Sequence, residues 1–93
     1  MKARNINGTS DNTCRCGSWI QHWKNYGGNS EHPFCSALRC TRTDVVGAHV
    51  QKEYGSKWYI IPLCPEHNNM RGETIDVSAS TVFVSANVAE TCG

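Results

Sequence analysis

Two pairs of metal-ligating side chains limit what this chain can fold into more than any other feature of its sequence. Cys35 and Cys40 are separated by four residues, and Cys64 and His67 are separated by two. Two such thiolate and imidazole pairs, about 25 residues apart, are typical of one tetrahedral zinc ion bound by four side chains. Because four protein ligands leave no open position, we expect this zinc to be structural rather than catalytic.

The chain is short enough to need such a centre. It has 93 residues, of which 39% are hydrophobic, and globular domains usually contain about 45–50%. At this length we expect one domain, and a structural metal commonly compensates for a small core. We predict that the polar residues 1–13 form a mobile tail and that residues 14–93 form a single zinc-stabilised domain.

The six cysteines also allow another interpretation, three disulfides in a secreted protein. However, residues 1–20 contain no apolar stretch of the roughly 7–15 residues that a secretory signal requires. The longest apolar run, residues 59–63, is too short to cross a membrane. We therefore expect a cytoplasmic protein without membrane contact, in which clustered cysteines are reduced and bind metal.

The pattern of apolar and turn residues predicts a small α+β domain. Ser18 and Gln21 have the capping-box spacing, so a helix is expected from there to Gly27. The further predicted elements are strands at 45–50 and 58–63, a short helix at 65–70, and a C-terminal hairpin of 74–77 with 81–88. The order of cysteine knuckle, hairpin and metal-binding helix is that of a treble clef.

The remaining cysteines suggest a second zinc site. Cys14 and Cys16 form a C-x-C-G turn, and Cys92 could return to this turn and join the two ends of the domain. His22 on the first helix is the expected fourth ligand, and His32 is the alternative. A disulfide between Cys92 and one of the other two cysteines, or free thiols, would explain the same residues without a metal.

Two stretches of the sequence resemble the HNH nucleases, which are ββα-metal enzymes that often carry a structural zinc. These stretches are GAHV at 47–50 and WYIIPLCPEHNN at 58–69, and the resemblance covers about residues 35–72. It implies a treble-clef, HNH-like ββα core. It also implies that His49 activates the water that attacks phosphate and that Asn68 binds the catalytic divalent metal.

The sequence departs from the HNH pattern at two positions. Ala48 stands where the family commonly has an acidic metal ligand, and no counterpart of the middle asparagine precedes Trp58. Asn68 and one imidazole make a poor ligand set for a hard cation such as Mg²⁺. These differences indicate a degenerate catalytic site.

The resemblance favours DNA or RNA as the partner. The net charge is only +1, but residues 1–42 carry six Lys/Arg against two Asp/Glu, which favours a basic surface. We therefore expect a zinc-binding HNH-like treble-clef protein that binds nucleic acid. The alternatives are a structural or protein-interaction zinc domain, and an active metal-dependent endonuclease that uses Mg²⁺ or Mn²⁺ besides the two zinc ions.

Overall fold

A hairpin of two long strands forms the middle of the molecule. The computed structural model describes residues 2–6, 18–27, 31–70 and 72–86. In it, strand β2 (Val46–Lys52) pairs antiparallel with strand β3 (Trp58–Leu63). The prediction for β3 is confirmed, whereas β2 begins one residue later and ends two residues later than expected.

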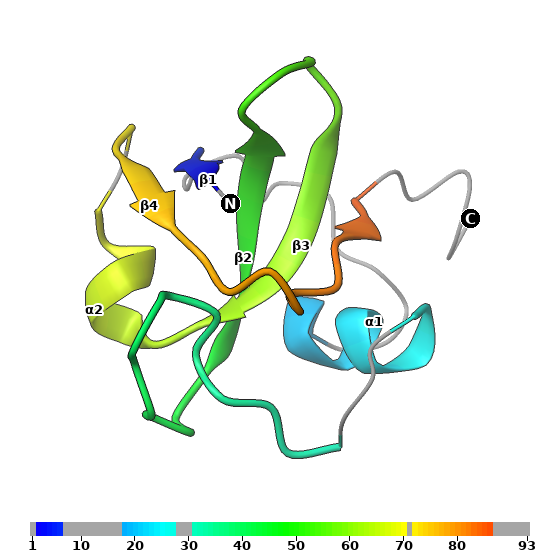
Figure 1. The fold of residues 1–93 in the computed structure, drawn as a ribbon. Coiled ribbons are helices and arrows are strands. Elements are labelled where there is room, and N and C mark those ends of the chain that lie inside the picture. Colours follow the sequence, from blue (N-terminus) through cyan, green and yellow to red (C-terminus); the bar gives the residue numbers. More distant parts are fainter. Residues whose placement is uncertain (1, 7–17, 28–30, 71, 87–93) are drawn as a thin grey trace.

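Three short strands extend this hairpin into one antiparallel sheet with the order β4-β1-β2-β3-β5 (Figure 1). They are β1 (Lys2–Asn5), β4 (Thr74–Asp76) and β5 (Val84–Ser85), and the helices are α1 (Trp19–Asn25) and α2 (Pro65–Asn68). The predicted α+β class is confirmed. Neither of these helices is long and apolar enough to cross a bilayer.

The prediction of a mobile tail at residues 1–13 is wrong for its first part, because Lys2–Asn5 form strand β1. This strand pairs with β2 on one side and with β4 on the other. Its two inward residues, Ala3 and Asn5, are fully buried. Neither is large and apolar, so the segment lacks the hydrophobic alternation that marks a strand in a sequence. Residues 7–13 lie outside the described part of the chain.

The predicted C-terminal hairpin is also wrong, because its two strands do not pair with each other. β4 pairs with β1, and β5 pairs with β3, so they lie at opposite edges of the sheet (Figure 1). An edge strand offers unpaired backbone N–H and C=O groups. β4 and β5 therefore each pair with a strand at a different edge of the sheet, and these two pairings replace the predicted hairpin.

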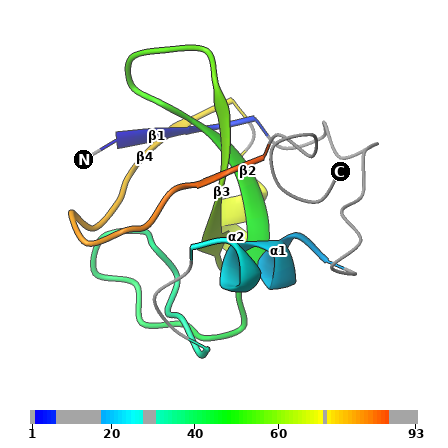
Figure 2. The same cartoon turned by 90° about the vertical axis from the view of Figure 1, so that its right-hand side faces the viewer.

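Alternate residues of the hairpin contribute to two cores on opposite faces of the sheet. One core packs around the cysteines, and its buried residues are Ala3, Cys35, Ala37, Ala48, Val50, Ile61, Leu63, Cys64, Ile75 and Val77. The other is smaller, and its buried residues are Trp23, Ile60 and Val84. Helix α1 lies on the side of the smaller core, and α2 lies on the other side of the hairpin (Figures 1 and 2).

Helix α1 begins and packs as the sequence predicts. The Ser18 side chain accepts a hydrogen bond of 3.2 Å from the backbone N–H of Gln21, and Gly27 follows the helix with φ +142°. Trp23 is only 2% exposed, and its indole N–H donates to the carbonyl of Val82 at 2.8 Å. The side of this helix that carries Trp23 therefore belongs to a core.

A glycine allows α1 to lie directly on the backbone of β2. A Cβ atom added at Gly47 would lie 2.3 Å from the carbonyl carbon of Trp19 and 2.4 Å from the amide nitrogen of Ile20. Both are backbone atoms and cannot turn aside. The small residue at this position therefore sets the distance between helix and sheet.

Candidate metal centre

Three elements bring four metal-ligating side chains together, as the spacing predicts. Cys35 and Cys40 come from the loop before β2, Cys64 follows β3, and His67 lies on α2. Their ligand atoms all lie within 4.8 Å of one another. The His67 Nδ1 atom is 3.1 Å from Cys64 Sγ and 3.6 Å from Cys35 Sγ. Ligands on a zinc tetrahedron are about 3.5–3.8 Å apart, so this Cys3His cluster could hold one metal ion and is compatible with zinc.

Backbone hydrogen bonds hold the first cysteine pair against the sheet. The N–H of Ser36 donates to the Pro62 carbonyl, and the N–H of Leu38 donates to the Asp76 carbonyl, both at 2.8 Å. Arg39 has φ +66°, a left-handed conformation that is uncommon for a residue other than glycine. The turn at Arg39 reverses the chain, so that Cys40 returns toward Cys35.

Helix α2 is set up locally by the chain that follows β3. Cys64 has the extended backbone of an N-cap residue (φ −67°, ψ 161°), and Pro65 occupies the first turn, where its missing N–H and fixed φ are favourable. The predicted helix at 65–70 is shorter in the structure and ends at Asn68. This single turn suffices to bring His67 back over Cys64.

The two buried thiols of the cluster have opposite pKa shifts. Burial raises the pKa of Cys35 to about 12. Burial also raises the pKa of Cys64, but the adjacent His67 amide and imidazole and the Cys35 thiol outweigh it and lower the value to about 7. Cys64 therefore forms a thiolate near neutral pH. A metal must displace the Cys35 proton, so its binding releases protons and weakens as the pH falls.

Asn5 anchors the metal-binding helix from the opposite end of the sequence. Its side-chain amide donates to the carbonyl of His67 at 3.0 Å and to that of Asn68 at 2.9 Å. The residue is fully buried, and its own carbonyl accepts from Gly72 N–H at 2.8 Å. The sequence does not predict this role. No local signal marks it, because the partners of Asn5 are 62 and 63 residues away.

An exposed arginine links the cysteine loop to α2. The Arg42 guanidinium forms a two-point ion pair with Asp44 and lies 3.5 Å from a Glu66 carboxylate oxygen. The hydrogen bond and charge of Asp44 raise the pKa of Arg42, and the nearby Cys64 and Glu66 add to this. These groups are exposed, so the pairs stabilise the fold weakly, and they link the cysteine loop to Glu66 on α2.

The predicted second zinc site stays a prediction. Cys14, Cys16 and Cys92 lie outside the described residues. His22, the expected fourth ligand, is fully buried, and its Nε2 atom is 2.8 Å from the carbonyl oxygen of Ser85. The alternative ligand, His32, is exposed in the loop before Cys35.

The two residues that the HNH resemblance makes catalytic lie on opposite faces of the sheet. His49 is 5% exposed, and its ring meets the Trp19 ring edge-on at 4.7 Å on the α1 side. Its neighbours Ala48 and Val50 point into the other core, on whose side Asn5 holds Asn68. Burial, and then the charge of nearby His22, lowers the pKa of His49. His49 is therefore a neutral core residue under α1.

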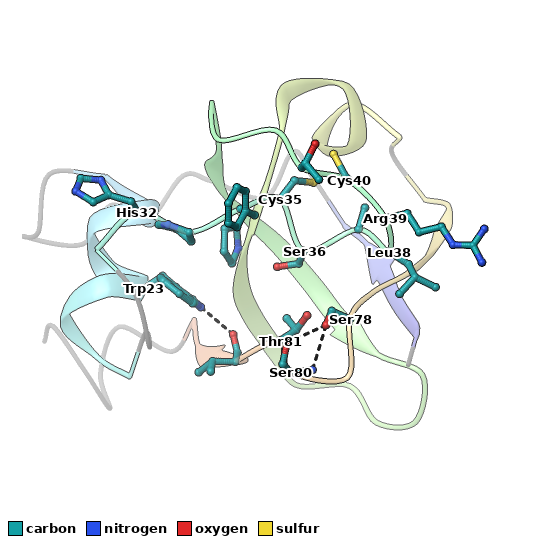
Figure 3. Close-up of a pocket in the computed structure, with 16 residues that line it drawn as sticks. Trp23, His32, Cys35, Ser36, Leu38, Arg39, Cys40, Ser78, Ser80 and Thr81 are labelled. Atoms are coloured by element: carbon teal, nitrogen blue, oxygen red, sulfur yellow. Dashed lines mark hydrogen bonds between the residues drawn. The ribbon is translucent and has the colours of Figure 1, made fainter.

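A cavity of about 440 Å³ lies beside the cysteine loop (Figure 3). Ser78 and Thr81 line one wall and Trp23 lines another, while Arg39 points away from it (Figure 3). Two apolar residues of the lining, Phe34 and Leu38, are 61% and 57% exposed. The cysteine loop therefore presents apolar side chains to solvent beside a hollow.

Comparisons of the chain with known protein families, with curated proteins and with solved structures found no match. The HNH resemblance therefore stays a hypothesis that depends on the residue pattern at 47–50 and 58–69. The geometry of the Cys3His cluster does not depend on that resemblance, because it follows from the positions of the four ligand atoms.

Proposed function

We propose that the chain is a zinc-stabilised treble-clef module of HNH type that binds nucleic acid and does not cleave it. The observation that carries the zinc centre is the convergence of four donor atoms within 4.8 Å. The order of elements supports the treble clef, because a cysteine loop, the β2–β3 hairpin and α2 follow one another. A bound zinc ion would cross-link these three elements.

Two observations favour binding over hydrolysis at the HNH-like residues. His49 is buried against Trp19, whereas a general base must come within hydrogen-bond reach of the water it activates. Ala48, next to it, offers no ligand atom for a divalent cation. The positions that a nuclease would use for water activation and metal binding therefore serve packing in this chain.

Nucleic-acid binding and cleavage can be tested together on the zinc-loaded protein. The protein is incubated with plasmid and with short oligonucleotides in Mg²⁺, Mn²⁺ or Ni²⁺, and both retention and strand breaks are measured. We expect retention that weakens steeply with added salt, and intact plasmid with every ion. Cleavage that His49→Ala abolishes would establish the endonuclease instead, and absence of retention at low salt would remove nucleic acid as the partner.

A protein-interaction domain is the second candidate, because Phe34 and Leu38 expose large apolar side chains on the cysteine loop. Exposed apolar side chains that lie together commonly mark protein contacts. Binding of this kind would depend little on salt and would be lost in Leu38→Ser. Salt-dependent retention of oligonucleotides by Leu38→Ser at the wild-type level would argue against it.

A further inference from the structure

One row of side chains on the sheet is left open by α1. Thr74, Arg4, Gln51 and Trp58 lie directly opposite one another across β4, β1, β2 and β3. Directly opposed residues of antiparallel strands point to the same face, so the four side chains form one continuous row. We call these four residues the open row.

Helix α1 covers a neighbouring row of the same face and stops short of this one. The neighbouring row contains His49, Ile60 and Val84, all of which are buried. Figures 1 and 2 show α1 at the end of the hairpin opposite the β2–β3 loop. In the open row, by contrast, Arg4 and Thr74 are exposed and Trp58 is 44% exposed.

Charged side chains of both signs lie beside the open row. A hollow of about 290 Å³ is lined by Arg4, Gln51 and Thr74 of the row together with Lys2, Lys52, Glu53 and Gly55. Three of these seven residues are cationic and one is acidic. Lys2 is paired with Asp76 at 3.0 Å. The Lys52 ammonium lies 4.7 Å from the centre of the Tyr59 ring, which packs against the cysteine core, so its charge faces away from the open row.

Arg4 is the cation best placed to bind an anion. Within the described residues, the ion pairs are Lys2 with Asp76 and Arg42 with Asp44 and Glu66, so none of them neutralises Arg4. Its exposed guanidinium stands two strands from Trp58, a separation of about 10 Å. Arginine binds phosphate through two parallel hydrogen bonds, and an exposed indole offers a flat surface on which a base can stack.

We infer that the open row binds single-stranded nucleic acid, with a backbone phosphate at Arg4 and an unpaired base on Trp58. Positive charge that follows the backbone, combined with an aromatic platform, is the usual arrangement in proteins that bind single strands. A duplex keeps its bases stacked inside, so it can use the charges but not the indole. This inference depends on the proposed nucleic-acid function and adds to it the face and the type of strand.

The experiment measures the fluorescence anisotropy of labelled single-stranded DNA, single-stranded RNA and matched duplexes over a series of salt concentrations, with the zinc-loaded full chain. We expect single strands to bind more tightly than duplexes. Trp58→Ala should weaken single-strand binding about tenfold or more, and Trp58→Phe should retain most of it. Arg4→Gln should weaken binding and reduce the slope of log K against log salt by about 0.7.

The control is Arg39→Gln, which removes the same charge from the exposed turn of the cysteine loop and should bind as the wild type does. Circular dichroism and zinc content should be equal in all variants.

If the wild type binds but Arg4→Gln and Trp58→Ala bind equally well, the open row is the wrong face and the proposed function stands. Tighter binding of duplexes would overturn the single-strand assignment, and no binding of any oligonucleotide would overturn both proposals.

Discussion

The two faces of the sheet hold their cores together by different means. On the α1 face, the largest buried side chain is Trp23, which packs with Ile60 and Val84. On the other face, the buried core contains two of the ligands, Cys35 and Cys64, together with three alanines, and its largest buried side chains are Ile61 and Leu63. A buried aromatic ring stabilises a core through the apolar area that it removes from water, whereas a cluster of thiol and imidazole ligands contributes stability when it binds a metal. The first face is therefore an apolar core, and the second, the metal face, contains a ligand cluster that could hold an ion.

The hairpin connects the two faces because its residues alternate between them. His49 on the α1 face lies between Ala48 and Val50 on the metal face. A disturbance of either core therefore reaches the other through the same two strands. Metal removal and substitutions that act on one face at a time should show whether each core can be destabilised without the other.

The largest effect is expected from removal of the metal. A chelator in excess, or Cys64→Ser, should unfold the chain. Structural zinc contributes about 10–16 kcal/mol in small zinc domains, which matches or exceeds the total stability of about 5–15 kcal/mol of ordinary domains. Amide chemical-shift dispersion would show the loss, and added zinc should restore it in the wild type only. Dispersion that survives in EDTA would show that the metal face holds itself together without an ion.

Trp23→Ala should produce the next largest effect. It removes the main buried side chain of the α1 face and the hydrogen bond to the Val82 carbonyl. We expect a loss of about 3–5 kcal/mol of unfolding free energy, measured by urea denaturation with zinc in excess. Native mass spectrometry should still find zinc bound, because no ligand has changed. A variant that cannot retain zinc would show that the two faces form one indivisible unit.

Asn5→Ala tests the metal face without changing a metal ligand, because the side-chain amide of Asn5 donates to the backbone of α2. Two partly buried carbonyls of α2 lose their donor, at a cost of about 1–3 kcal/mol. Zinc affinity, measured by competition with a chromophoric chelator, should fall about 10- to 100-fold, as it does when partners of metal ligands are lost. Asn69→Ala, at the exposed end of α2, is the control and should retain the affinity of the wild type.

The smallest effect expected is a pH dependence from His49. Burial, and then His22, holds the pKa of folded His49 below its usual value of 6.5, so the unfolded chain binds this proton more strongly. The stability that neutral His49 contributes is present above pH 6.5 and is lost as the pH falls toward the folded pKa. Urea denaturation of the zinc-loaded protein at pH 7.5 and 5.5 should therefore show a larger decrease in the wild type than in His49→Gln.

The pH dependence of the metal ligands is common to both proteins in that comparison, because Cys35, Cys40, Cys64 and His67 are unchanged. The difference between the two therefore isolates His49. Equal decreases would mean that His49 is not held neutral by its surroundings.

Sequence reasoning succeeded where a signal is local. The Ser18 cap of α1, strand β3 and the two ligand pairs, Cys35 with Cys40 and Cys64 with His67, are each marked by residues a few positions apart. It failed where partners are distant. No pattern in residues 2–5 predicts β1, because the stability of this strand comes from backbone pairing with β2 and β4. The C-terminal strands were paired with each other because nothing local shows that each edge of the sheet is open to one of them.

The sequence by itself determined that four soft and borderline ligands occur in two short pairs, that a hairpin separates the pairs, and that α1 is amphipathic. These are properties of spacing and side-chain chemistry, which are the same in every conformation of the chain. Only the tertiary structure decided that the Asn5 side chain donates to the backbone of α2 and that His49 is buried beneath Trp19. It also decided that Arg4 and Trp58 share an exposed row. Each of these depends on which strands become neighbours, and that choice is made by the free energy of the whole packed sheet.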